Sequence, residues 1–164
     1  MKMTKRIGLR RRHLPGFIWL GALAGLAGGF AEIAWIYVYA ELAGLDAGKV
    51  ARGISTAVGM GASDAPTLYG IAIHMALAIA LGIALTFMLR PALRRLPGDG
   101  AIYAAAFVVL TGVWIINFLV VLPRLSPAFV HLVPYQVSLL SKLLFALAAA
   151  LVFRSTHIIS LARK

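Results

Sequence analysis

A few polar side chains stand inside long apolar segments, and four of them are the residues of the sequence that could do chemistry. They are Glu32, His74, Asn117 and Lys142, one in each of four apolar runs. Ionisable residues inside membrane spans commonly pair with one another or mark proton and ion paths. At a helical rise of about 1.5 Å per residue, each lies roughly 7–12 Å from the outer end of its run. The sequence therefore predicts a polar cluster in the outer half of a membrane.

The residues alone leave two roles open for this cluster. Glu32 and Lys142 could form a static ion pair, because a lone charge in a low-dielectric setting would instead be neutralised by a pKa shift. Alternatively, Glu32 could handle a proton or a ligand. The pocket could be extended by four residues close to the start of the last run, namely His131, Tyr135, Gln136 and Ser138.

A haem-binding or quinone-binding redox role is a weaker alternative. A bis-histidine b-haem needs two ligands that face each other, and only His74 with His131 comes near this requirement. The chain has no cysteine, which excludes disulfides and thiolate metal ligands. It also lacks a phosphate-binding glycine loop, a nucleophile elbow and a His-Glu-x-x-His run. We therefore predict no catalytic residue, no metal site and no cofactor, and we do not expect an enzyme.

Four apolar segments must position these residues. A helix needs about 20 apolar residues to cross the hydrocarbon core, and residues 17–40, 69–89, 101–122 and 135–153 meet this length. Hydrophobic residues make up 62% of the chain and charged residues only 13%, whereas a soluble domain carries about 25% charged residues. The runs are continuous rather than alternating, which favours helices over strands. We predict an all-α integral membrane four-helix bundle that forms one domain over residues 17–153.

Basic residues predict the orientation. The tail 1–16 holds six Lys and Arg residues and no acidic residue, and basic residues also fill the second loop and the tail 154–164. Because Lys and Arg gather on the cytoplasmic side, both termini are expected in the cytoplasm. The net charge of +11 then indicates contacts with anionic lipids rather than with nucleic acid.

Glycines predict close contacts between helices. In the first run, Gly21, Gly25 and Gly28 lie on one helical stripe with Glu32, and a small residue at every fourth position lets another helix approach closely. A transport path would need more than four helices, so this face could also join two copies of the chain. The predicted packing residues are Gly21, Gly25, Gly28, Gly29, Gly70 and Gly82.

The loop between the first two runs is long. Within it, residues 47–60 place Val50, Ile54 and Ala57 on one apolar helical face. This spacing favours a short helix on the membrane surface, although a simple connector fits the sequence equally well.

The pattern as a whole resembles small four-helix inner-membrane proteins of bacteria that have no assigned function. The resemblance lies in the glycine-rich first run, His74 early in the second, Pro123 at the end of the third and a polar start to the fourth. It implies a topology and a place in the bacterial inner membrane, and no activity. We therefore expect an accessory or structural subunit that packs against a larger membrane complex, such as a respiratory or photosynthetic one. The alternative is a transporter or a proton- or ligand-handling protein. The expected partners are the lipid bilayer and other membrane subunits or a second copy.

Overall fold

The computed structural model is all-α and describes the backbone of residues 14–95 and 99–162, with side chains within 16–89 and 100–155. Its long helices are α1 (Leu14–Ala43), α3 (Pro66–Arg95), α4 (Asp99–Ile116) and α7 (Tyr135–Ala162). Shorter ones are α2 (Ala47–Ala57), η1 (Asn117–Val121), α5 (Leu122–Leu125) and α6 (Pro127–Leu132). Most of the predicted tail 1–16 and the last two residues of the tail 154–164 lie outside the described residues.

Within the described residues, four stretches are long and apolar enough to cross a membrane, which is compatible with a small membrane protein. They are Gly16–Ala43, Pro66–Leu89, Gly100–Leu125 and Tyr135–Ser155. Each contains one of the predicted segments and exceeds it by up to a turn. The last helix runs on to Ala162, because residues 154–162 contain neither proline nor glycine to end it.

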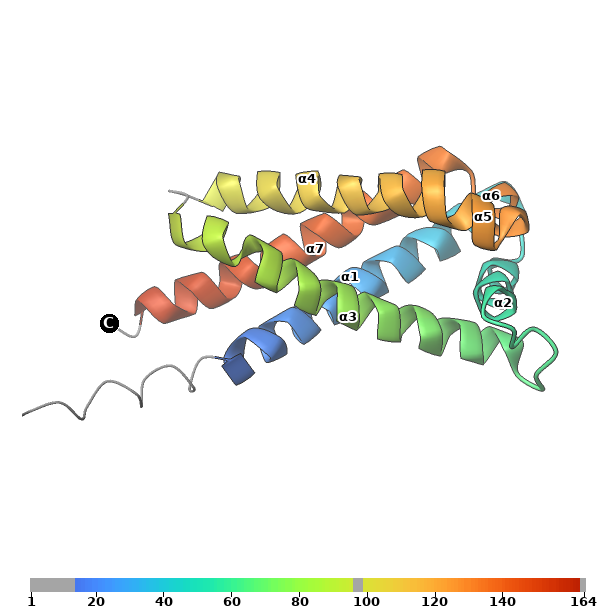
Figure 1. Cartoon of the computed structure of the whole chain (residues 1–164), viewed down its shortest axis with the longest axis horizontal. Coiled ribbons are helices and arrows are strands. Elements are labelled where there is room, and N and C mark those ends of the chain that lie inside the picture. The colour runs from blue at the N-terminus through green and yellow to red at the C-terminus, as the bar shows by residue number, and fades with distance from the viewer. Residues whose placement is uncertain (1–13, 96–98, 163–164) are drawn as a thin grey trace, which may run out of the picture.

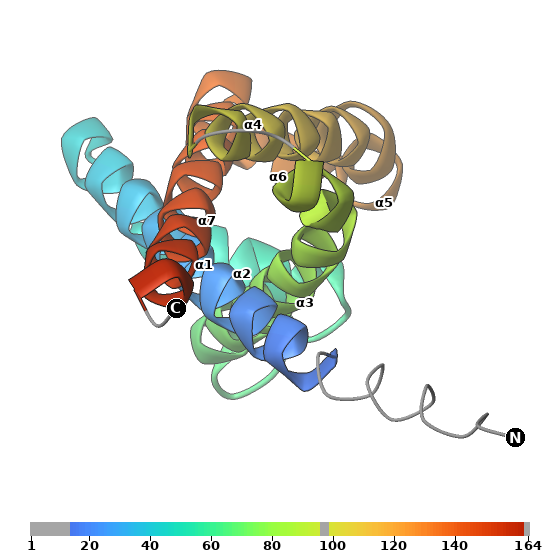
Figure 2. The same ribbon diagram turned by 90° about the vertical axis from the view of Figure 1, so that its left-hand side faces the viewer.

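The four long segments surround a common centre. Helix α1 packs extensively against α3 and α7, whereas α4 packs mainly against α7 and much less against α3. Figure 2 shows the resulting order, in which α1 and α4 lie on opposite sides with α3 and α7 between them. The start of α1 and the end of α7 lie at one end of the molecule, and α2 and α6 lie at the other, which we call the α2 end (Figure 1).

Local sequence signals explain the breaks at the α2 end. Gly44 follows α1 with a φ of +64°, a left-handed conformation that glycine adopts without strain and that commonly ends helices. Asp46 then caps α2, because its side chain accepts a hydrogen bond of 2.8 Å from the Gly48 amide. Proline stands in the first turn of α3 and of α6, where its missing N–H leaves no bond unmade.

Glycines set the distance between α1 and its neighbours. A Cβ added at Gly21 would lie 2.6 Å from the Cα of Ile83, and one at Gly25 would collide with the Ala78 carbonyl. One added at Gly82 would collide with the backbone of both α1 glycines. The backbones of α1 and α3 therefore touch at these glycines. The glycine face of α1, which could have joined two copies of the chain, is covered by α3 of the same chain.

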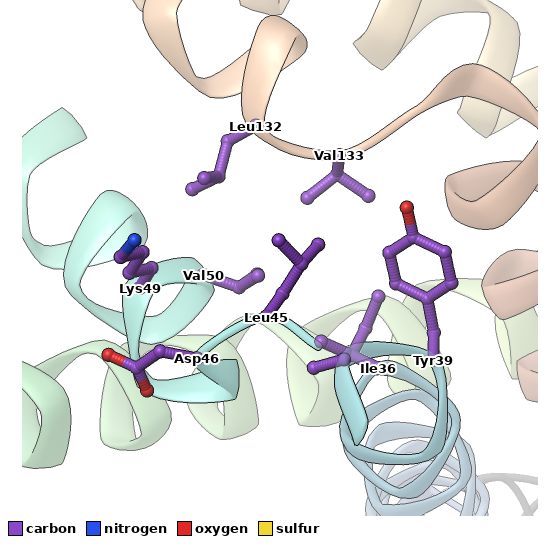
Figure 3. Close-up of a pocket in the computed structure, with 9 residues that line it drawn as sticks. Ile36, Tyr39, Leu45, Asp46, Lys49, Val50, Leu132 and Val133 are labelled. Atoms are coloured by element: carbon purple, nitrogen blue, oxygen red, sulfur yellow. The ribbon is translucent and has the colours of Figure 1, made fainter. Parts of the chain in front are cut away.

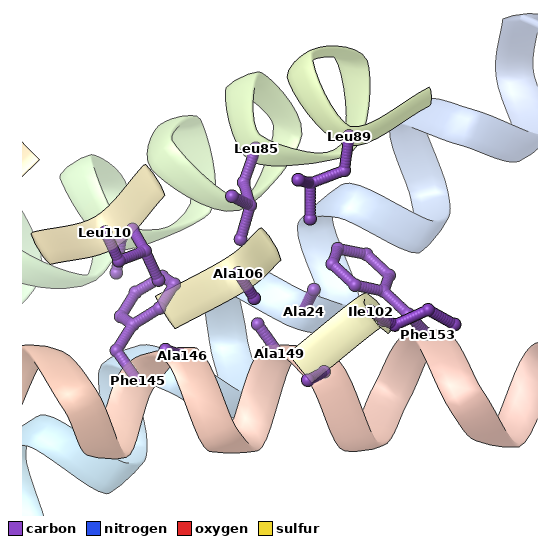
Figure 4. Close-up of a cluster of buried hydrophobic side chains, with 12 residues drawn as sticks. Ala24, Leu85, Leu89, Ile102, Ala106, Leu110, Phe145, Ala146, Ala149 and Phe153 are labelled. Carbon is purple, nitrogen blue, oxygen red and sulfur yellow. The ribbon is translucent and has the colours of Figure 1, made fainter. Parts of the chain in front are cut away.

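The apolar core extends from the contact between α1 and α3 toward the end of the molecule that is remote from α2. Figure 4 shows Phe145 and Phe153 of α7 packed among Leu85 and Leu89 of α3 and the α4 side chains Ile102, Ala106 and Leu110. Phe145 is fully buried, and a Cβ added at Gly28 of α1 would lie 2.6 Å from its ring. Glycines thus let α1 approach both α3 and α7 closely. Residues one turn further along α1 therefore lie close to both helices.

Candidate functional site

Glu32 is the centre of a buried ionic cluster at the α2 side of the core. It lies one helical turn after Gly28, and its side chain is only 5% exposed. Its Oε1 atom lies 2.6 Å from Nζ of Lys142 on α7, whose side chain is 15% exposed. The two charges therefore form a close pair shielded from the surroundings, as one of the two roles predicted from the sequence requires.

His74 brings a third ionisable group to the same carboxylate. Its Nε2 atom lies 3.6 Å from Glu32 Oε2, which is beyond hydrogen-bond distance. This nitrogen is buried and has no hydrogen-bond partner in the described part of the chain. Because buried polar atoms are nearly always hydrogen-bonded, an orphaned nitrogen beside a carboxylate is a feature that calls for an explanation.

Two further contacts complete the surroundings of the pair. The hydroxyl of Ser141 donates to Glu32 Oε1 over 3.5 Å, and Nζ of Lys142 lies 5.3 Å from the centre of the Phe145 ring. The aromatic face favours the ammonium group electrostatically. Ser141 is not among the residues that the sequence analysis predicts for this site. The feature that could have indicated it is a small polar residue next to Lys142 on an apolar helix, because serine commonly forms hydrogen bonds across helices in membranes.

Asn117 does not join this cluster. It is the first residue of η1, it is half-buried, and no hydrogen bond or ion pair links its side chain to Glu32, His74 or Lys142 in the described structure. The physical reason is lateral distance. Equal depth along four helices does not make four side chains meet, and α4 lies across from α1 (Figure 2). The structure therefore brings together three of the four predicted residues.

The expected pocket extension falls into a separate aromatic group. Nε1 of Trp114 donates to the Ser138 hydroxyl over 3.0 Å, and that hydroxyl donates to the Tyr135 carbonyl. The Trp114 ring also meets the Tyr135 ring edge-on, with centroids 6.3 Å apart. These contacts fix the start of α7 to α4. Gln136 and His131 are exposed and do not contact the cluster.

A small pocket lies at the junction of α1, α2 and α6, and it is mostly apolar (Figure 3). None of the three cluster residues lines it. Beside it, Arg52 of α2 lies 2.5 Å from Asp46 and 3.4 Å from the Thr67 hydroxyl of α3. The hydrogen bond from Arg52, followed by that from the Gly48 amide, holds the pKa of the Asp46 carboxyl below its usual value.

The cluster can hold and exchange a proton, since it combines an imidazole, a carboxylate and an ammonium group. Within the described residues, no three His, Asp or Glu side chains come together as a metal ion would need. No protein-family model matches the chain, and neither a curated protein nor a solved structure is significantly similar to it. The function must therefore be argued from the residues.

Proposed function

We propose that this protein is an accessory subunit that packs against a larger complex in a bacterial inner membrane, with both termini in the cytoplasm. The basic residues of the two tails and of the second loop support the orientation. They also support contact with anionic lipid headgroups on that side. The one observation that carries the subunit role is the open face of the third span.

Two properties of the third span bear on this role, and lipid alone does not explain the second. Only 17% of the most apolar stretch of the third span is buried, against 39% in the fourth. Val108 is 72% and Ile116 60% exposed, which suits lipid tails and protein equally. Asn117, which lies on the same span, does not suit lipid tails. Its amide can donate two hydrogen bonds and accept others, and hydrocarbon offers no partner for them.

A neighbouring transmembrane helix with a polar side chain would satisfy the Asn117 amide. Asparagine commonly forms hydrogen bonds between helices in membranes. Gly112 lies on the same span, and nothing lies within 4 Å of the position that its Cβ would occupy. A second helix could therefore approach the α4 backbone closely at Gly112, as small residues at helix contacts allow.

Co-purification tests this proposal. The chain is tagged at its native expression level and extracted in mild detergent, and the recovered proteins are quantified. We expect partners in fixed stoichiometry, and recovery of the chain as a free monomer or homo-oligomer would overturn the proposal. A hydrogen bond across helices contributes about 1 kcal/mol, so Asn117→Leu should lower partner recovery about fivefold. The control Ile116→Leu keeps the face apolar and should leave recovery unchanged.

A further inference from the structure

The orphaned nitrogen of His74 is a feature that the subunit role does not use. Lys142 and Ser141 both approach Oε1 of Glu32, so the second oxygen, Oε2, is the one that faces His74. The nitrogen and this oxygen are 3.6 Å apart. An N–H on Nε2 would find its natural acceptor in Oε2, which lies close to it and has no other partner of its own among the contacts described above.

We propose that His74 and Glu32 form a proton-binding site within the membrane-spanning part of the chain. The proton adds to the lone pair of Nε2 on a neutral imidazole, and the imidazolium then donates to Oε2 while Lys142 keeps Oε1. No bond other than the new N–H forms, and the proton comes from water. The carboxylate thus moves from one cationic partner to two, and the net charge of the cluster rises from zero to +1.

The exposure of the three side chains gives their order within the cluster. The His74 side chain is 24% exposed, compared with 15% for Lys142 and 5% for Glu32. The imidazole is thus the outermost member of the cluster, while its Nε2 atom is itself buried and faces Glu32. Glu32 lies behind it and stabilises the charge that His74 acquires, as an opposite charge within about 4–6 Å does.

The neighbouring elements supply few other charges. From α1 the group that faces His74 is Glu32, and from α7 it is Lys142. On α2, Arg52 is engaged with Asp46 and Thr67, and Thr67 precedes His74 by seven residues. On the third span no Asp, Glu, Lys, Arg or His occurs between Gly100 and Pro123. The protonation of His74 is therefore governed by one anion and one cation.

A metal ion is the competing occupant, because imidazole and carboxylate are both metal ligands. A structural zinc site usually has four ligands and a catalytic one three. The described chain offers only two near this position, since no third His, Asp or Glu joins them. The proton is the ligand that two such atoms bind without further groups.

Nitrogen NMR of the full chain tests the proposal. The protein is labelled with ¹⁵N-histidine and placed in phosphatidylcholine nanodiscs, whose zwitterionic surface does not concentrate protons. The imidazole signals are then followed from pH 4 to 9. His74→Gln identifies the signal of His74, and His131→Gln serves as the control that should leave it in place. We expect the His74 signal to titrate as a single group.

The link to Glu32 is tested by substitution. Glu32→Gln should move the midpoint of the His74 titration by about one pH unit or more, whereas Glu41→Gln at the exposed end of α1 should not move it. If Glu32→Gln does not fold, Glu32→Asp keeps the charge but shortens the side chain by one methylene group, and the greater distance from the carboxylate to Nε2 should also move the midpoint. A His74 signal that is constant from pH 4 to 9, or a midpoint that is indifferent to Glu32, overturns the proposal. So does stoichiometric loss of the titration in micromolar Zn²⁺.

Discussion

Removing the charge of Glu32 should destabilise the protein strongly. Glu32→Gln keeps the size of the side chain but leaves the Lys142 ammonium, 15% exposed, without its anion. Two unit charges 2.6 Å apart attract each other by about 6 kcal/mol at an effective dielectric constant of about 20. Part of this is offset by the desolvation of both groups. Breaking a buried pair by removing one partner costs about 3–5 kcal/mol in measured cases, and we expect a value in this range.

The assay is reversible unfolding in mixed micelles of mild detergent and SDS, followed by far-UV circular dichroism. The matched control is Glu41→Gln, the same change at an exposed position, which should alter the free energy of unfolding by less than about 0.5 kcal/mol. Lys142→Met alone should destabilise by a similar amount to Glu32→Gln, because it leaves the carboxylate buried.

The double variant Glu32→Gln with Lys142→Met decides whether the pair itself is responsible. It buries no uncompensated charge, so its free energy of unfolding should lie within about 1 kcal/mol of the unmodified chain. If the double variant is instead destabilised by the sum of the two single changes, the residues are not coupled. In that case the reasoning from their 2.6 Å contact is refuted.

Four further predictions concern other parts of the chain. Gly25→Ala should destabilise the protein by about 1–3 kcal/mol in the same unfolding assay, because the added methyl collides with the α3 backbone. Gly112→Ala meets open space and should be neutral or stabilise by up to about 1 kcal/mol. As the pH falls below the lowered pKa of Asp46, its carboxyl loses the charge that strengthens the cap of α2 and holds Arg52. The protection factors of the α2 amides against hydrogen exchange should then fall at low pH and should be low at every pH in Asp46→Ala, which has no capping oxygen. Trp114→Phe loses a hydrogen bond between α4 and α7 and should cost about 0.6 kcal/mol in the unfolding assay.

The spans and the ionic pair could be predicted from the sequence because both depend on distances along a chain. Apolar length gives the four segments, and the spacing from Gly28 to Glu32 places the carboxylate on the packed face of α1. Lys142 falls at a matching depth. Depth is a coordinate along the membrane normal, and it contains no information on which helices are neighbours. Equal depth alone therefore groups Asn117 with the other three residues, although α4 does not pack against α1.

The local shape of the third span could not be predicted from periodicity. At Asn117–Val121 the helix widens into a π-helix, and Pro123, which has no N–H to donate, follows within α5. The guanidinium of Arg124 donates to the Val120 carbonyl over 2.6 Å, so a side chain satisfies part of the backbone there. A wider turn changes the angular phase of all later residues, and a helical wheel with a fixed 100° step cannot follow it.

The two proposals act on different helices, and this makes them separable. The ionic cluster joins α1, α3 and α7, which the glycine contacts of α1 already hold close together. The open face belongs to α4, which is held mainly from the side of α7. Asn117→Leu should therefore reduce partner recovery and leave the His74 titration unchanged, whereas Glu32→Gln should shift that titration. If Asn117→Leu also shifts it, the two sites are coupled. Helix α7 is then the element that carries the coupling, because it contacts α4 through Ser138 and bears Lys142 one turn later.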